Sequence, residues 1–559
     1  MKRIKLILCA ALATVLLFTV SGLFACKQRG GEKIDKARTQ LYVHNLDAGY
    51  RNDWLLAVKP RFENAYKDIP FESGKTGVQV MITGAKTFGT TLRAQIKALN
   101  SEVFFNESVN YYDYLADNLL LDITDVVTDS LAEYGDTGTI EDKMTADQID
   151  FFNVDGKYYG VPHYVGYEGI VYDAKLFEDY MLYFKDGAGS SFISSPDNKR
   201  SAGPDGVYDT ADDGLPATYD EFFKLCDYMV ELGITPFVWT GKHSDTYLEK
   251  AMYAMSIDHD GLEQGRLNYT FRGTAKNIIN PVGSDKKYSL KYGSEGVQIT
   301  PENGYLTWAS EGKYLAMSFW ERVIRKSSYY GPNVFSPSHM HLDAQKDFLE
   351  STPKGKPIAM IVEGTWWESE ANDSIKLYAD YYGEEYSQEN RKFAMMPFPK
   401  ASTEKIGQKR TLVDLHYSLG FIKASIAGHK IDLAKKFLKF CNTEESLTEF
   451  STITNSAKAL RYDMDSASYE AMSYFGKSVY NMQRNSDVVY PFSSEKIYLN
   501  NQDILFVDNA FGSTIGTQEE SRPLSYIRKS QSNTAELYFN GMLTFNQERW
   551  NRVFGAYFS

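Results

Sequence analysis

Cysteine is scarce in this chain of 559 residues, which contains four. Cys9 and Cys26 lie in the N-terminal segment, so the folded part holds Cys226 and Cys441. Both of these lie on apolar helical faces, and we expect two buried thiols that act as small core residues. A disulfide between them is possible in principle, but nothing in the sequence supports it. No Cys/His cluster has zinc spacing, which excludes a metal centre of that kind.

Positive charge is also in short supply. Lys and Arg total 60 against 73 Asp and Glu, which gives a formal net charge of −13. No long run of Lys or Arg is present, so the electrostatic footprint of a phosphate-backbone binder is missing. We therefore expect no nucleic-acid partner, and we expect the excess acid to keep the protein soluble.

Recognisable catalytic motifs are missing as well. The sequence has no nucleophile elbow, no Walker A loop and no His-Glu-x-x-His run. Glu363 and Glu368 are candidate carboxylates for sugar hydrolysis, yet nothing marks them as a catalytic pair. We predict that the protein is not an enzyme and binds its ligand without changing it. A surface glycoside hydrolase and a sugar-sensing receptor are the alternatives.

The N-terminus has the features of an export signal. Lys2, Arg3 and Lys5 precede an uncharged, mostly apolar run over residues 6–24. The run ends in Leu-Phe-Ala-Cys at residues 23–26, which resembles a lipobox, in which Cys26 carries lipid with palmitate-type chains. An uncleaved membrane anchor is the alternative, because the run approaches the roughly 20 residues that a spanning helix needs. We predict a signal peptide over 1–25, a tether over 26–38 and a lipid-anchored protein facing the extracellular side or the periplasm.

The length and the order of the elements predict more than one lobe. A chain of 559 residues is too long for a single compact core. Strand-like and helix-like patterns alternate from the first residues of the folded part, and we expect strands over 41–44, 78–83 and 103–105 and helices over 52–66 and 90–99. Such alternation predicts a parallel sheet wrapped by helices, with ligands at the carboxyl ends of the strands.

The middle of the chain is marked by turns and helix caps. Asp155-Gly156 predicts a hairpin turn between strands over 151–154 and 157–162. Thr218 and Glu221 form a capping box for a helix over 222–232. A strand over 358–362 is followed by Gly364 and a second capping box, Thr365 with Glu368. This pattern predicts that Trp366 and Trp367 lie in the first turn of a helix, at the carboxyl end of a strand.

These segments together carry a resemblance to a known family. The matching segments span 155–164, 169–177, 218–222, 359–367, 395–399 and 434–440. In this order, and after an export signal, they resemble the extracellular solute-binding proteins of ABC importers, family 1, the maltose-binding-protein type. The chain is longer than typical members, with its surplus around 183–215, 256–300 and beyond about 480.

The resemblance implies both a fold and a function. The fold is α/β and two-lobed, periplasmic-binding-protein-like (type II), with a hinge and a ligand cleft between the lobes. Lobe 1 would comprise 39–155 plus about 405–450, and lobe 2 would comprise 156–404 plus about 451–559. The protein would be a monomer that captures a carbohydrate, predicted to be an oligosaccharide, and delivers it to the permease subunits in the membrane. Peptides and other polar solutes are the alternative ligands.

A sugar site needs flat aromatic rings and polar groups that bond hydroxyls. Trp366 matches the position at which the family stacks a tryptophan on the sugar, and one of the pair Trp366-Trp367 is alternatively core. Tyr164, Tyr167 and Trp239 are further candidate rings. The candidate polar groups, which could alternatively cap helices, lie at or near predicted strand ends: His44, Asn45, Asp47, Asn106, Glu107, Glu363 and Asp414.

One acidic loop predicts a second site. Residues 205–214 combine clustered carboxylates with glycines, and Ca²⁺ takes six to eight oxygen ligands. The spacing resembles calcium loops of the thrombospondin type and does not fit an EF-hand. We predict structural Ca²⁺ held by Asp205, Asp209, Asp212 and Asp213, with a solvated acidic turn as the alternative. No other cofactor is expected.

Overall fold

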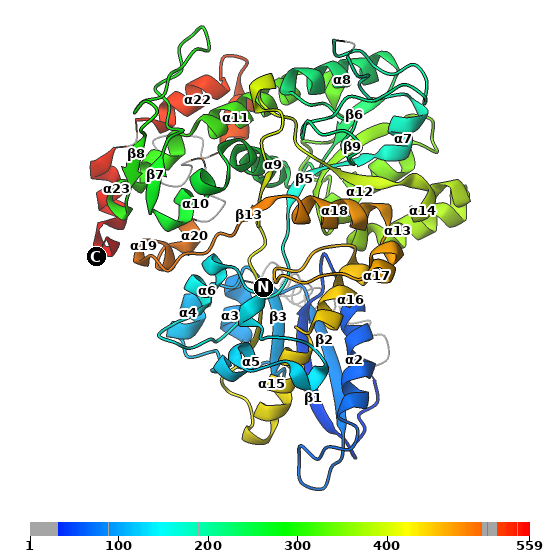
Figure 1. Ribbon diagram of the computed structural model, residues 1–559, viewed down its shortest axis with the longest axis vertical. Coiled ribbons are helices and arrows are strands. Elements are labelled where there is room, and N and C mark those ends of the chain that lie inside the picture. The colour runs from blue at the N-terminus through cyan, green and yellow to red at the C-terminus, as the bar shows by residue number, and fades with distance from the viewer. Residues whose placement is uncertain are drawn as a thin grey trace, which may run out of the picture.

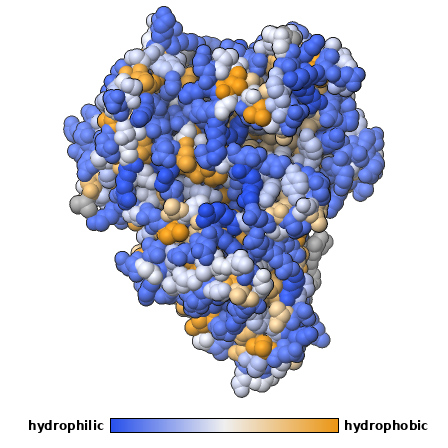
Figure 2. All heavy atoms as spheres, viewed as in Figure 1, coloured by the Kyte–Doolittle hydropathy of each residue, from blue (hydrophilic) through white to orange (hydrophobic). Residues whose placement is uncertain are grey.

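A computed structural model describes residues 32–87, 89–187, 189–505, 511, 522–544 and 546–558. The predicted signal peptide and Cys26 lie outside these residues. Two lobes of unequal size are joined by a narrow waist (Figure 1). The visible face of both lobes is mainly hydrophilic (Figure 2). No helix in the described part of the chain has the length and apolar character needed to cross a membrane.

The first lobe is built on a five-stranded sheet. Its strand order is β2-β1-β3-β12-β4, where β1 pairs in parallel with β2 and β3, and β12 runs antiparallel to β3 and β4. The strands are β1 (Thr39–Leu46), β2 (Val78–Ala85), β3 (Val103–Glu107), β4 (Val161–Pro162) and β12 (Ser418–Ile422). The predicted β-α-β-α-β opening is therefore correct, and the carboxyl ends of β1 and β3 share one edge of the sheet.

Seven α-helices accompany this sheet in the described residues. They are α2 (Asp53–Ala65), α3 (Gly89–Gln95), α4 (Tyr111–Ala116), α5 (Thr124–Thr128), α6 (Ala146–Phe152), α15 (Ile431–Phe440) and α16 (Glu444–Thr454). The late helices α15 and α16 return to this lobe, where the Phe62 and Phe437 rings meet edge to face and Arg61 pairs with Glu449 at 2.6 Å. The predicted strand over 151–154 is wrong at its start, because residues 151 and 152 end α6.

The second lobe is built on a four-stranded sheet. The strand order is β10-β5-β9-β6, in which β5 runs antiparallel to both of its neighbours and β6 is parallel to β9. The strands are β5 (Glu168–Asp173), β6 (Thr235–Val238), β9 (Ile358–Gly364) and β10 (Phe393–Met396). All seven residues of β9 are buried, which fits a strand covered on both faces.

Helices pack around this second sheet. They include α7 (Ala174–Asp179), α8 (Tyr219–Glu231), α9 (Ser244–Asp260), α10 (Leu262–Thr270), α11 (Glu311–Arg325), α12 (His341–Ser351), α13 (Trp367–Tyr382), α14 (Gln388–Arg391), α17 (Ser466–Ala471) and α18 (Tyr474–Arg484). Thr218 caps α8, since its hydroxyl accepts from Glu221 N, but the predicted capping box is incomplete because Glu221 Oε2 accepts from Ala217 N. Gly233 follows the helix with a φ of +76°. Cys226 is buried on α8 and Cys441 follows α15, and both thiols are free.

Three segments cross between the lobes. The first comprises residues 163–167, between β4 and β5. The second, residues 414–417, joins β11 (Thr411–Val413) to β12, and the third follows α16 at residue 455. The first and third are tied by a β-bridge between Tyr164 and Lys458. Because β4 pairs with the first sheet, the chain leaves lobe 1 after Pro162 and not at residue 156.

The segments that lengthen the chain pack mainly on the second lobe. A short hairpin, β7 (Gly273–Ala275) with β8 (Val297–Ile299), lies within the predicted surplus over 256–300. The tail adds β13 (Asp487–Val489), which pairs in parallel with β11. It continues with α19 (Lys496–Leu499), α20 (Gln502–Leu505), α21 (Pro523–Lys529), α22 (Ala535–Met542) and α23 (Gln547–Phe554). Of these, α21 and α22 pack on α11, which places the tail against lobe 2 (Figure 1).

Candidate functional site

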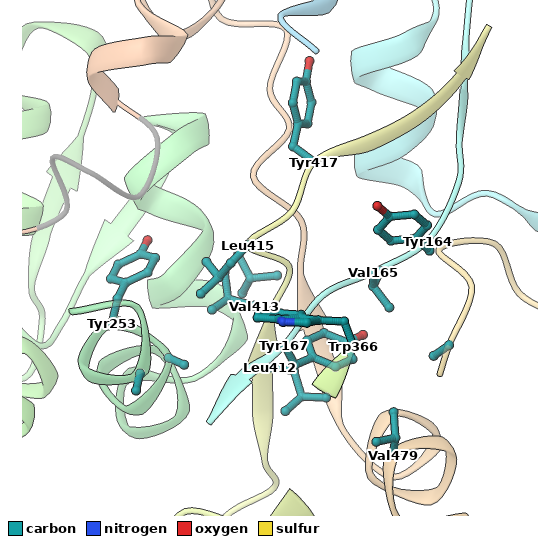
Figure 3. Close-up of a cluster of buried hydrophobic side chains, with 14 of the residues drawn as sticks. Tyr164, Val165, Tyr167, Tyr253, Trp366, Leu412, Val413, Leu415, Tyr417 and Val479 are labelled. Atoms are coloured by element: carbon teal, nitrogen blue, oxygen red, sulfur yellow. The ribbon is translucent and has the colours of Figure 1, made fainter. Parts of the chain in front are cut away.

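Trp366 lies where the two lobes meet. It follows the carboxyl end of β9 and is the N-cap residue of α13. Its ring lies 4.2 Å, centroid to centroid, from the ring of His416 on the second crossing segment. Figure 3 shows the Trp366 ring beside this segment, which carries the labelled Leu415 and Tyr417. A Cβ on Gly49, in the loop after β1, would lie 3.4 Å from Trp366 Cβ. Trp366 is only 6% exposed, so lobe 1 and the crossing segment together cover it.

The backbone around Trp366 is shaped to hold its ring. A Cβ on Gly364 would lie 2.0 Å from the indole, a distance that real side chains do not reach. Glycine is therefore required there, because the ring folds back over the end of its own strand. The predicted capping box at Thr365 does not form, since the N-cap is Trp366 and its side chain makes no capping hydrogen bond.

The hydroxyl of Thr365 instead bonds across the interface. Thr365 Oγ1 lies 2.9 Å from the hydroxyl of Tyr50, which comes from lobe 1. Tyr50 also donates to Val165 O at 3.1 Å and accepts from Ser456 Oγ at 2.7 Å. One buried phenol from lobe 1 therefore bonds to two crossing segments and to the second lobe. Sequence reasoning missed Tyr50, since its partners lie far away along the chain.

Glu107 of lobe 1 provides a carboxylate beside the crossing segments. It ends β3, accepts a hydrogen bond from the hydroxyl of Tyr164, and lies 2.9 Å from Nδ1 of His416. Burial raises the pKa of Glu107, but His416 and Tyr164 outweigh that effect and hold the pKa below its ordinary value. Glu107 is therefore ionised at neutral pH.

The second lobe supplies a matching group of polar side chains. Glu168 begins β5, and Lys250 Nζ of α9 lies 3.5 Å from its Oε1. Gln345 of α12 donates to Glu363 Oε1 at 3.2 Å and to Glu370 Oε2 at 2.8 Å. Burial, with Glu370 and Glu168 nearby, raises the pKa of Glu363 well above its ordinary value. The surroundings of Glu363 therefore favour its neutral form, whereas those of Glu107 favour the ionised form.

Carboxyl groups from both lobes affect the same tyrosine of α9. Burial first, and then the charges of Glu363, Glu168, Glu370 and Glu107, raise the pKa of the Tyr247 phenol well above its ordinary value. One tyrosine on α9 thus senses carboxylates from both lobes. We call the following residues the interlobe polar cluster: Glu107, Tyr164, His416, Glu168, Tyr247, Lys250, His341, Gln345, Glu363 and Glu370.

Four of the predicted residues come together at this interface. Trp366 lies against His416, Tyr164 bonds Glu107, and Glu363 lies on the second-lobe side of the cluster. Tyr167, on the first crossing segment, is 2% exposed, and its hydroxyl has no hydrogen-bond partner among the described residues. These rings and carboxyl groups are positioned from both lobes, as a ligand held between lobes would require.

Two predicted rings lie in the core instead. Trp367 is fully buried, and its ring meets Phe348, Phe393 and Phe475. Consecutive helical residues point about 100° apart, so only one of the two tryptophans can face the interface. Trp239 is also fully buried, against the rings of Tyr330 and Phe335. The prediction of ligand contact is therefore corrected for both residues.

Asp414 and the polar residues after β1 form hydrogen bonds within the protein. Asp414 Oδ1 accepts from Gly166 N at 3.0 Å and from His416 N at 3.1 Å, which joins two crossing segments. Burial raises the pKa of Asp414 to about 6. Asn45 Nδ2 donates to Asn52 Oδ1 at 3.0 Å, and Asn52 Nδ2 donates to Asp47 Oδ1 at 3.1 Å, so these residues hold the start of α2. Neither Asn45 nor Asp47 caps α2, because its N-cap residue is Asn52 and no side chain makes a capping hydrogen bond there.

His44 and Asn106 lie inside the first lobe. The His44 ring packs on Phe104 at 5.3 Å, and burial lowers the pKa of the imidazole below its ordinary value. Asn106 is fully buried and donates to Thr87 O at 3.0 Å, while its Oδ1 has no partner among the described residues. His44 is therefore neutral core at neutral pH, whereas Asn106 keeps an acceptor atom free.

The acidic loop folds on itself through hydrogen bonds. Asp212 accepts from Asp205 N at 3.3 Å and from Thr210 Oγ1 at 2.6 Å, and Asp213 accepts from Asp209 N at 2.9 Å. Burial and the neighbouring Asp205 raise the pKa of Asp212 to about 6. Within the described ranges, no set of three or more His, Cys, Asp or Glu side chains is arranged to hold a metal ion.

Calcium binding at this loop stays a prediction that a melting experiment tests. If the carboxylates of Asp205 and Asp212 bind calcium, EDTA should lower the Tm and added calcium should restore it, since a ligand of the folded state stabilises that state. Asp213→Asn should reduce the calcium effect. A Tm that neither EDTA nor calcium changes would leave the loop as an acidic turn.

A buried carboxyl near the interface predicts a pH-dependent stability. Glu368 of α13 is 2% exposed and accepts from Ser473 Oγ at 2.5 Å, and burial raises its pKa from 4.5 to about 7. The folded state holds a proton that the unfolded state releases, so stability falls as the pH rises from about 4.5 to about 7. We expect Glu368→Gln to remove this loss, worth up to about 3 kcal/mol at pH 8. Urea unfolding of both proteins at pH 4.5 and pH 8 checks this, and a pH-independent difference would contradict it.

A separate cavity lies between the lobes near α6 and α10. Its volume is about 270 Å³, and its lining includes Asp147 and Asp150 from α6 and Arg266 from α10. Arg266 and Asp147 form an ion pair that connects the lobes on this side. Arg51 and Asp373 pair at 2.9 Å, also across the lobes. The lobes therefore touch through Trp366 and Tyr50 and through ion pairs as well.

A family model and solved structures both match this chain. A family model described as bacterial extracellular solute-binding protein matches residues 69–470. A solved structure described as a chitin oligosaccharide binding protein is 17% identical, with a TM-score of 0.51, over 89% of this chain and 99% of that one. Another, from work on xylan utilization by the thermophilic bacterium Caldanaerobius polysaccharolyticus, is 14% identical, with a TM-score of 0.52, over 91% and 100%. Among curated proteins, no significant match was found.

Proposed function

Because this chain belongs to the bacterial extracellular solute-binding protein family, we propose that it captures an oligosaccharide between its two lobes and delivers it to the permease of an ABC importer. The two-lobed α/β fold is the one that the family and its structural neighbours share. One neighbour is described as binding chitin oligosaccharides and the other comes from work on xylan utilization, and both of these are carbohydrates. They support the choice of a sugar over a peptide.

The observation that carries the proposal is the position of Trp366. Its ring lies at the lobe interface beside hydrogen-bonding groups from both lobes, among them Glu107 and Glu363. A sugar presents C–H patches on its faces and hydroxyls at its edge, so an aromatic platform beside acceptor groups suits it. The contacts of Tyr50 and Trp366 across the lobes describe a closed state, and separation of the lobes would open the same surface for entry.

The remaining parts of the proposal concern location and partners. We place the protein outside the cytoplasm, held to the membrane by lipid on Cys26, and acting as a monomer beside its permease. Lipid attachment at Cys26 would keep the binding lobes near that permease. Palmitate labelling of the full chain and of Cys26→Ala tests the anchor, and label retained by the variant would reject it.

Binding without turnover is the direct test of function. Isothermal titration of the full-length protein with cellotriose, xylotriose and chitotriose should give saturable, reversible binding to at least one of them. Chromatography after long incubation should recover that sugar unchanged. Cleaved products would indicate a glycoside hydrolase instead, and failure of every oligosaccharide while a peptide panel binds would reject the carbohydrate ligand.

A further inference from the structure

Two side chains on the second-lobe side of the interlobe polar cluster offer acceptor oxygens that receive no hydrogen bond within the described part of the chain, although Lys250 Nζ lies 3.5 Å from Glu168 Oε1. Glu168 is 3% exposed, and neither of its carboxylate oxygens accepts a hydrogen bond from a described residue. Gln345 is 2% exposed, and its Oε1 is likewise without a donor there, although its Nε2 donates to two carboxyl groups. A buried acceptor left without a partner costs about 1–3 kcal/mol. These atoms are therefore positioned for donors that come from a ligand.

The lysine and the two histidines of the cluster lie beside carboxyl groups. Lys250 lies 3.5 Å from Glu168, His416 lies 2.9 Å from Glu107, and His341 lies 3.7 Å from Glu370. Each lysine and histidine of the cluster thus already lies beside a carboxyl group of the protein. The cluster sets four carboxyl groups against one lysine and two histidines, so positive charge is not in excess around a ligand.

An anionic ligand would therefore meet two separate costs. Its carboxylate would face Glu168 acceptor to acceptor, since an ionised carboxylate has no proton to donate. Burial raises the pKa of Glu168 and the nearby Lys250 lowers it. In the ionised form of Glu168 the two like charges would also repel in a site shielded from water, where such contacts cost several kcal/mol. A hydroxyl or an ammonium group in the same place would instead supply the missing donor.

From this geometry we infer the substrate class of the site: it selects oligosaccharides that donate hydrogen bonds to Glu168 and Gln345, and it rejects those that carry a carboxylate, such as uronic acids. This inference rests on the proposed function. It adds the rule that the captured sugar carries no carboxylate. Neutral and amino-bearing sugars satisfy the rule through the same donor chemistry. Specificity of this kind comes from the groups left unpaired with the wrong ligand.

Matched ligands test the rule on the wild-type protein. The neutral trimer that binds best is compared with the same trimer carrying one primary alcohol oxidised to carboxylate, and trigalacturonate is added. Titration should give a Kd at least about tenfold higher for each anionic sugar. Equal affinity, or anionic sugars that bind while neutral ones do not, would overturn the rule but keep a sugar-binding protein. If no sugar of any charge binds, the proposed function itself fails, and the rule fails with it.

A charge-neutral variant tests the residue assignment. Glu168→Gln keeps the size of the side chain but removes the charge and one acceptor. We expect about tenfold weaker binding of the neutral trimer, and a preference for neutral over oxidised trimer that shrinks by at least about threefold. Glu178→Gln, on α7 of the same lobe, should change neither value. Unchanged binding by Glu168→Gln, with its melting temperature preserved, would remove Glu168 from the site.

Discussion

Replacement of Trp366 with alanine is expected to raise the Kd for the captured oligosaccharide at least about tenfold, which corresponds to about 1.4 kcal/mol. Loss of an aromatic contact accounts for about 0.5–1.5 kcal/mol, and the lost burial of apolar area adds to it. The effect should fall on binding more than on stability, because the ring packs against Gly49 and His416 at an interface that opens when the lobes separate. Isothermal titration and thermal melts of both proteins measure the two effects separately.

The same helix provides the control for this prediction. Tyr381 lies near the other end of α13 and is 78% exposed, so Tyr381→Ala should leave both the affinity and the Tm as they are. Trp366→Phe keeps a flat ring and should recover part of the lost affinity. If Trp366→Ala binds the sugar as tightly as the wild type, the ring does not touch the ligand and the site must be placed elsewhere between the lobes.

Trp367→Ala should have the opposite profile and the largest effect on stability. The ring is fully buried among Phe348, Phe393 and Phe475. Replacement of a buried Trp or Phe with alanine lowers the free energy of unfolding by about 3–5 kcal/mol. Urea unfolding followed by fluorescence and circular dichroism measures this loss. At a temperature where the variant is still folded, its affinity for the sugar should stay within about threefold of the wild type.

Substitutions at the two neighbouring tryptophans should have different effects on binding and on stability. Trp367→Phe leaves a smaller cavity and should cost less than Trp367→Ala. A loss below about 1 kcal/mol for Trp367→Ala would mean that the second lobe tolerates the cavity, against the packing described here. Equal effects of Trp366→Ala and Trp367→Ala on both binding and stability would contradict the separate roles of the two rings.

Local patterns were sufficient for much of the fold. The alternation of apolar runs and helical patterns predicted β1, α2, β2, α3 and β3 in the right order, and the Thr218 cap placed the start of α8. The strand β9 and the turn after it put Trp366 at a strand end. These features depend on residues within a few positions of each other, and so periodicity and capping chemistry reveal them.

The site was only partly predictable. Trp366, Tyr164, Glu107 and Glu363 lie at the interface as expected from their places at or near strand ends. Trp239 occupies an equivalent strand end, but it faces the core against Tyr330 and Phe335. A strand end fixes where the backbone is, whereas the direction of the side chain depends on neighbours that come from elsewhere in the chain.

The sequence by itself determined the order of strands and helices, the need for at least two lobes and the tryptophan pair at the end of β9, because each follows from local propensity or from chain length. The tertiary structure alone decided which tryptophan faces the interface, that Thr365 bonds Tyr50 across the lobes instead of capping α13, and that Glu168 keeps its oxygens without donors. Tyr50 and Thr365 are 315 positions apart, and a contact over that distance exists only once both lobes have folded and met.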